Sequence, residues 1–197
     1  MKVSVIGSGR WGTFIAWYLH SVGHAVTLCG RKCSESLLAL KRERKNNLLT
    51  LPDGIEIAEL PESLAEAEVV LISVASQALS SLLEGIREHV AGKPLVLCIK
   101  GLESKTGRRL SQIAEAATGG ACRIAVWIGP GHVQEFLKGV PNCMVIDSED
   151  EALKYGLVDA FSSDLIRFYY GRDILGNEIG AASKNVVGIA AGMLDGL

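Results

Sequence analysis

Short apolar runs alternate along the chain with longer amphipathic runs, which is the pattern of strands separated by helices. The apolar runs predict seven strands, at residues 3–6, 25–29, 69–74, 95–99, 124–128, 143–146 and 166–170. The amphipathic runs predict helices at residues 11–22, 34–44, 76–90, 106–117 and 149–162, with a further short helix entry at Pro61. Several strands are continuously apolar, as strands covered on both faces are. The pattern therefore predicts a doubly wound, mainly parallel α/β sheet.

The stretch from Asn177 to Leu194 departs from this alternation. It is rich in small residues, with larger apolar ones at Ile179, Val186, Val187, Ile189, Met193 and Leu194. This composition predicts one long helix that is apolar around much of its girth and therefore buried. We expect an α/β domain over residues 1–172 and, over residues 173–197, the first helix of a second helical domain that is otherwise missing.

Composition narrows the possible classes of protein. Hydrophobic residues make up 48% of the 197 residues, which excludes general disorder. The 20 Lys and Arg against 22 Asp and Glu leave a net charge of −2, without the basic excess of a nucleic-acid-binding protein. Because no apolar run approaches the roughly 18 residues of a membrane span, we expect no stable membrane insertion.

The five cysteines are an odd number and include no CxxC pair. We interpret them as reduced, mostly buried thiols of a cytoplasmic protein. A metal site or a catalytic thiol is the alternative, but no spacing of ligands supports either. We therefore expect no metal.

A glycine-rich segment lies between the first predicted strand and the first predicted helix: Gly7-Ser8-Gly9-Arg10-Trp11-Gly12. In a GxGxxG loop the first glycine allows the tight turn, the second lets the backbone approach a pyrophosphate, and the third lets helix and strand pack closely. The pattern predicts a Rossmann-type fold that binds a dinucleotide at this loop. A glycine-rich turn without a ligand is the alternative. We expect Trp11 to pack in the core rather than to stack on a ligand.

The end of the second predicted strand indicates which dinucleotide is bound. An acidic residue there binds the ribose 2′-hydroxyl of NAD, but this chain has Arg31 and Lys32 instead. Because the planar guanidinium of arginine suits a phosphate, we expect NADP to be accepted and to be favoured over NAD. Ordinary surface cations are the alternative.

Further motifs follow in order along the whole chain. They are Val74-Ala75-Ser76-Gln77, Lys100-Gly101-Leu102-Glu103, Gly129-Pro130-Gly131-His132, Asp173-Ile174-Leu175-Gly176 and Gly180-Ala181-Ala182-Ser183-Lys184-Asn185. With the GxGxWGT opening, this set resembles the NAD(P)-dependent glycerol-3-phosphate dehydrogenase family. Several positions depart from the family pattern, among them Ala75 for proline, Gly131 for serine, and Ala181 and Ser183 for glycine and leucine. The helical domain with which the family continues has no counterpart here.

The resemblance implies an oxidoreductase of glycerol-3-phosphate metabolism and phospholipid biosynthesis. Its reaction is reversible hydride transfer between NAD(P)H and dihydroxyacetone phosphate, giving sn-glycerol 3-phosphate. The implied partners are this small phosphorylated three-carbon substrate and a second copy of the chain in a homodimer, and no nucleic acid.

The resemblance also implies catalytic roles for Lys184, Lys100 and Asn185, and substrate contacts for these three and Gly129. Lys184 would donate the proton, since a lysine in a desolvated cleft can have a pKa near neutrality. Lys100 would polarise the carbonyl, and Asn185 would bond substrate or a lysine. From the residues alone, Lys184 could be a lysine at a helix edge, Lys100 a strand-terminal cation facing water, and Asn185 a structural amide.

Cofactor contacts are implied for Ser76, Gln77, Lys100 and Glu135, in addition to the glycine loop, Arg31 and Lys32. Ser76 could equally be a helix N-cap, and Glu135 a solvated glutamate. We interpret His132 as a loop residue near the nicotinamide rather than as a general base.

Three alternative functions stay open at this stage. The chain could be an NADP-binding module without turnover, a related dehydrogenase of a hydroxy acid, or an interaction protein whose terminal helix pairs with a copy of itself.

Overall fold

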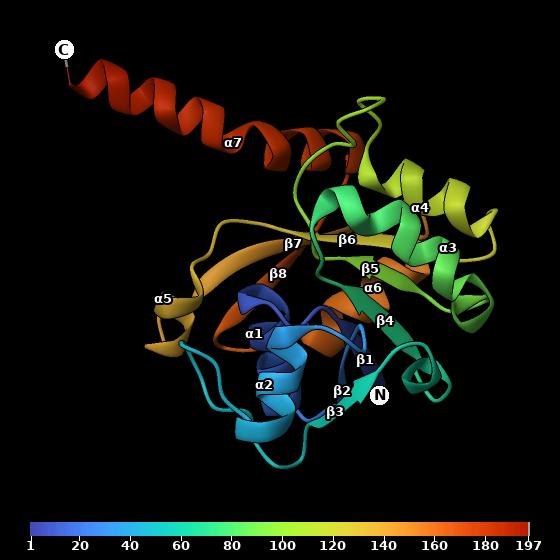
Figure 1. Ribbon diagram of the computed structural model, residues 1–197. Helices are drawn as coiled ribbons and strands as arrows, with labels where there is room; N and C mark the ends of the chain where they lie inside the picture. The colour runs from blue at the N-terminus through green and yellow to red at the C-terminus, as the bar shows by residue number, and fades with distance from the viewer. Residues whose placement is uncertain (197) are drawn as a thin grey trace.

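The computed structural model describes residues 1–196, which form one eight-stranded sheet flanked by helices (Figure 1). The strands are β1 (Lys2–Ile6), β2 (Ala25–Gly30), β3 (Glu56–Glu59), β4 (Val69–Ile72), β5 (Leu95–Leu97), β6 (Ile124–Ile128), β7 (Asn142–Ser148) and β8 (Ile166–Tyr170). The helices are α1 (Arg10–Ser21), α2 (Glu35–Glu43), α3 (Leu79–Val90), α4 (Leu110–Thr118), α5 (Val133–Leu137), α6 (Glu151–Phe161) and α7 (Ile174–Asp195), with short 3₁₀ turns η1 (Glu62–Leu64) and η2 (Ser76–Ala78).

The strand order confirms the predicted Rossmann-type, doubly wound sheet. The order is β3-β2-β1-β4-β5-β6-β7-β8, and every neighbouring pair is parallel except β6 with β7. The chain runs outward from β1 to β3 and then returns to β4 on the other side of β1. The carboxyl ends of β1 and β4 therefore form the switch point at which such sheets bind ligands.

Two apolar cores lie on the two faces of the sheet. Phe14 of α1, Phe136 of α5 and Phe161 of α6 belong to one core, whose largest buried side chain is Trp127 of β6. The other core packs α3 and α4 against the opposite face, and these two helices lie side by side in Figure 1. Strands β1, β4, β5 and β6 contribute apolar residues to both cores. The sequences of β4, β5 and β6 are therefore continuously apolar, whereas β1 also contains the buried Ser4.

Some element boundaries differ from the prediction. The edge strand β3 was missed because two of its four residues are glutamates and none is fully buried. Helix α5 was missed because its five residues are too few to show a helical period. Helix α4 begins at Leu110 rather than at residue 106, since residues 101–109 form a loop that is closed by a bridge between Leu102 and Arg109.

Helix α7 begins where expected but is not buried as predicted. Asp173 caps its start by accepting a hydrogen bond from the Gly176 amide at 2.9 Å. Only Glu178 and Ala181 of this helix are buried, and residues 183–196 are all exposed. The helix leaves the domain after its first two turns (Figure 1), so no described residue covers its apolar face. The division at residue 172 stays a prediction, and Leu197 lies outside the described residues.

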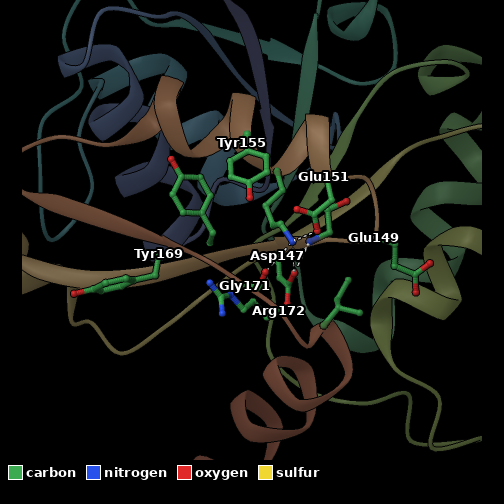
Figure 2. A pocket seen from close by; sticks show the side chains of 11 residues that line it. Asp147, Glu149, Glu151, Tyr155, Tyr169, Gly171 and Arg172 are labelled. Carbon is green, nitrogen blue, oxygen red and sulfur yellow. Dashed lines mark hydrogen bonds and ion pairs between the residues drawn. The ribbon is translucent and has the colours of Figure 1, made fainter.

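The buried Asp147 joins α7 to the sheet. It is 2% exposed, and one of its carboxylate oxygens accepts hydrogen bonds from the Asp173 amide (3.0 Å) and the Asn177 side chain (2.7 Å). The buried Lys154 lies 3.6 Å from the other oxygen and donates to the Gly171 carbonyl at 2.8 Å. Figure 2 shows Asp147 and Gly171 gathered at this junction, beside a cavity of about 710 Å³.

All five cysteines are free, and Cys29, Cys98 and Cys122 are buried. Among residues 1–196, no helix combines the length and the apolar character that crossing a membrane requires.

The junction predicts opposite effects for two glycine substitutions. A Cβ at Gly171 would overlap the carboxyl group of Asp147, which its hydrogen bonds hold in place, whereas a Cβ at Gly156 on α6 would meet open space. We expect Gly171→Ala to lower the free energy of unfolding by about 1–3 kcal/mol. Gly156→Ala should raise it by about 0.5–1 kcal/mol, because alanine favours a helix. Urea denaturation measures both, and equal effects of the two would contradict the packing described here.

Candidate active site

The glycine loop brings β1, β4 and α1 into close contact. Gly7 has a φ of +123°, and a Cβ there would overlap the backbone of Ser73, which follows β4. A Cβ at Gly12 would overlap the carbonyl of Gly7, whereas one at Gly9 would meet nothing within 4 Å. The first and third glycines are therefore needed for packing, and the space beside the second is open.

A cleft of about 580 Å³ runs beside this loop. It is lined by Gly7, Ser8 and Gly9 on one side, by Gly30 and Arg31 at the end of β2, and by Ser73, Val74 and Ala75 after β4. The N-terminus of α1 has no side-chain cap and no acidic residue in its first turn. Backbone amides and the positive end of the helix dipole are thus free for an anion, and the cleft fits the pyrophosphate of a dinucleotide.

The two predicted cations at the end of β2 are placed differently. Arg31 lines the cleft. Lys32 lies close enough to Glu59 of β3 to contribute, after Lys41, to lowering the pKa of that carboxyl. Only Arg31 of the pair is therefore positioned along the cleft.

Two serines of the cleft were not singled out from the sequence. Ser34 and Ser36 line it at the start of α2, with their hydroxyls 3.0 Å apart, and the Ser36 hydroxyl lies 2.6 Å from that of the buried Ser8. They add hydrogen-bonding groups next to Arg31. In the sequence, these two serines form a Ser-x-Ser pattern that is separated from the predicted cations Arg31 and Lys32 by one residue. That pattern could have indicated further phosphate-binding groups.

Trp11 is half-buried and packs as a core residue. Its ring stacks on Phe14 at a centroid distance of 5.3 Å and contacts the rings of Trp127 and Phe136. Arg10 begins α1 beside it and is exposed.

Lys100 and Lys184 meet although they come from distant elements. Lys100 follows β5 at the carboxyl edge of the sheet, and its ammonium donates to the Gly129 carbonyl at 2.8 Å. Desolvation by burial, together with the neighbouring positive charge of Lys184, lowers the pKa of Lys100 to about 8. The structure thus brings together three of the predicted residues, Lys100, Gly129 and Lys184.

The lysine pair lies next to the cleft. Gly101 has a φ of +130°, and a Cβ there would lie 3.3 Å from the Ser76 hydroxyl. Ser76 directly follows Ala75, which lines the cleft. Ser76 begins the turn η2 without capping it, because the N-cap positions of η2 and α3 are Ala75 and Ala78.

Gln77 braces the loop that follows Lys100. Its amide nitrogen donates to the Leu102 carbonyl at 2.8 Å, and its amide oxygen accepts from the Ser104 amide at 2.9 Å and the Ser104 hydroxyl at 2.7 Å. These bonds occupy both ends of the amide. Gln77 therefore orients the backbone next to Lys100, a role that the sequence did not indicate.

The remaining predicted residues lie apart from these contacts. Asn185 is exposed beside Lys184 on α7, and its side chain has no hydrogen bond to any residue in the range 1–196. Glu135 and His132 are exposed at the start of α5, which packs beside α1. Among residues 1–196, Glu135 forms no hydrogen bond or ion pair with either lysine.

A glycine loop at the switch point of a parallel, doubly wound sheet defines the class of this protein as a Rossmann-type α/β domain. Residues 2–154 match a family described as NAD-dependent glycerol-3-phosphate dehydrogenase N-terminus, and the chain belongs to this family.

Individual relatives agree with the family model. The chain is 32% identical over 202 residues to a glycerol-3-phosphate dehydrogenase [NAD(P)+] of Thermoanaerobacter sp. (strain X514), covering 100% of this chain and 60% of the relative. It is 36% identical over 201 residues to the protein of that name from Nitrosomonas eutropha, with 100% and 61% covered. The solved glycerol-3-phosphate dehydrogenase of Coxiella burnetii superposes with a TM-score of 0.89 at 26% identity, covering 99% of this chain and 61% of that one. The chain thus spans about 60% of the length of the curated relatives it matches.

The lysine pair predicts an abnormal titration of Lys100. We expect Lys100 to lose its proton near pH 8, and the Lys184→Met substitution to raise its pKa by on the order of one unit because a neighbouring positive charge is removed. NMR titration of ¹³C-labelled lysine side chains measures both values. A Lys100 that titrates near 10.5 in the unsubstituted protein would contradict this arrangement.

Proposed function

We propose that this chain forms the cofactor-binding part and the lysine pair of an NAD(P)-dependent glycerol-3-phosphate dehydrogenase. The reaction is the reversible reduction of dihydroxyacetone phosphate to sn-glycerol 3-phosphate. The observation that carries the proposal is the meeting of Lys100 and Lys184 beside a cleft that fits a dinucleotide. Membership of the family supplies the substrate class.

The lysines act on the carbonyl oxygen of the substrate. NAD(P)H, when bound, supplies the hydride. Negative charge then develops on the oxygen, and two adjacent ammonium groups stabilise it more than they stabilise the neutral ketone. The mutual repulsion of Lys100 and Lys184 is relieved as that charge appears, which favours the transition state over the ground state.

Lys100 is the better candidate for the proton donor. A pKa of about 8 places its proton within reach of transfer near neutral pH, whereas the resemblance assigned this role to Lys184. The Gly129 carbonyl orients the Lys100 ammonium instead of binding substrate directly. Lys184 then serves as the second cation, and Asn185, next to it on α7, bonds a substrate oxygen.

The preference for NADP rests on Arg31. Arg31 lines the cleft together with Ser34 and Ser36, and β2 ends in Gly30 rather than in an acidic residue. One cation and two hydroxyls are thus available to bind the 2′-phosphate of NADP. No carboxylate is present there to bind the free 2′-hydroxyl of NAD.

A cofactor-binding module without turnover is the second candidate function. It is favoured by the exposure of α7 from residue 183 onward, which leaves the region beyond Lys184 open to solvent in the described chain. A homodimer and a cytoplasmic location stay predictions, and the five free thiols agree with the latter.

Turnover separates the two candidates. Oxidation of NADPH and NADH is measured with dihydroxyacetone phosphate, together with a cofactor titration of the same sample. We expect turnover, and we expect Lys184→Met to lower kcat by roughly 10²–10⁴-fold with unchanged cofactor affinity. Lys105→Met, at an exposed loop lysine, is the matched control. Cofactor binding without turnover in the unsubstituted chain would establish the second candidate.

Arg31 is tested by comparing the two cofactors. We expect Arg31→Ala to weaken NADPH binding by roughly 10- to 100-fold, because a charged hydrogen bond to the 2′-phosphate is lost, and to leave NADH binding nearly unchanged. Fluorescence titration gives both dissociation constants, and Lys32→Ala serves as the neighbouring control. Equal weakening of both cofactors would refute a 2′-phosphate contact at Arg31.

A further inference from the structure

A buried glutamate ties the start of α7 to the start of α4. Glu178 is 4% exposed, and its carboxylate accepts hydrogen bonds from Arg109 Nη1 at 2.8 Å, the Ser111 amide at 2.9 Å and the Ser111 hydroxyl at 2.5 Å. Arg109 is the N-cap residue of α4, so the carboxylate also lies at the positive end of that helix. Charge-assisted bonds of this kind have a strict geometry and fix one helix relative to the other.

The same contact reaches Lys100 through a short, braced loop. Residues 100–109 run from the lysine to Arg109, and a bridge between Leu102 and Arg109 closes this loop. Gln77 holds its first half at Leu102 and Ser104. A displacement of Arg109 is therefore transmitted to the segment that carries Lys100.

On the other side, Glu178 and Lys184 share one helix. They are six residues apart, which is about 9 Å along the helix axis. Asp147 fixes the beginning of this helix through Asn177, and residues 183–196 are exposed. The contacts in the first two turns of α7 thus fix the orientation of the helix and, with it, the position of Lys184.

We propose that Glu178 is a positioning residue that sets the distance between Lys184 and Lys100 by bonding α7 to the start of α4. The catalytic consequence rests on the proposed function. The positional claim does not, because the proximity of the two lysines can be measured without turnover.

The test compares the titration of Lys100 in five variants of the 197-residue chain: Glu178→Gln, Arg109→Met, Arg109→Lys, Lys184→Met and Glu115→Gln. Glu178→Gln removes the carboxylate charge, and Arg109→Met removes its partner. Lys184→Met reports the full effect of the second ammonium. Glu115→Gln, on the exposed side of α4, is the matched control for a lost carboxylate.

We expect the pKa of Lys100 to rise from about 8 toward 10.5 in Glu178→Gln and Arg109→Met, by less than in Lys184→Met. Release of α7 separates the charges and admits water, and both changes raise a lysine pKa. Arg109→Lys, which keeps the charge, should restore part of the lowered value. Glu115→Gln should leave it unchanged, and the dissociation constant for NADPH should be the same in all variants.

Two results would overturn the proposal. One is a Lys100 titration that shifts in Lys184→Met but not in Glu178→Gln or Arg109→Met. The other is no shift in Lys184→Met, since the lysines are then not neighbours. If Glu178→Gln does not fold, the Lys100 titration in Arg109→Met tests the proposal instead, because Arg109 is the less buried partner of the Arg109–Glu178 ion pair.

Measurements of kcat and KM distinguish a failure of this proposal from a failure of the proposed function. In an active enzyme Glu178→Gln should lower kcat for dihydroxyacetone phosphate about 10-fold or more while KM for NADPH is unchanged. An enzyme without turnover contradicts the proposed function, and the Lys100 titration still decides whether Glu178 positions the pair.

Discussion

Helix α1 approaches the ends of β1 and β4 so closely that only hydrogen fits at two positions of the glycine loop. A Cβ at Gly7 would meet the backbone of Ser73, and one at Gly12 would meet the Gly7 carbonyl. This contact places the N-terminus of α1 over the switch point of the sheet. The cleft, its free backbone amides and the position of Arg31 beside it all depend on that approach.

The parallel sheet also determines where Lys100 and Lys184 come together. Carboxyl ends of parallel strands lie at one edge, so the segments after β1, β4, β5 and β6 meet there. Lys100 follows β5, and its partner Gly129 follows β6. Strands β7 and β8 run opposite to the other six, so α7 begins at the other edge of the sheet, packs along β6 and brings Lys184 to the edge of Lys100. Two like charges brought together in this way repel each other, and this repulsion contributes to the lowered pKa of Lys100.

The sequence predicts those parts of the structure that depend on local pattern. Strands such as β4 and β6 are continuously apolar because both faces are covered, so the first residue of each was predicted correctly. Strand β3, an edge strand with two glutamates, carries no such pattern. The apolar girth of α7 suggested burial, but periodicity cannot say whether a partner is present to cover a helix. Motifs pointed to Lys100 and Lys184, whereas the occupied amide of Gln77 and the lowered pKa of Lys100 arise from contacts between distant segments.

Helix α7 shows why buried carboxylates are suited to this junction. The buried residues of this helix, Glu178 and Ala181, lie in its first two turns. Apolar contact is non-directional and would tolerate rotation of so short a segment. The desolvation of Asp147 and Glu178 is costly, but each accepts several hydrogen bonds of fixed direction, and Lys154 and Arg109 neutralise them. Lys184 lies on this helix beyond its buried residues, so the angle of the helix must be fixed at its base: a small rotation there displaces the lysine.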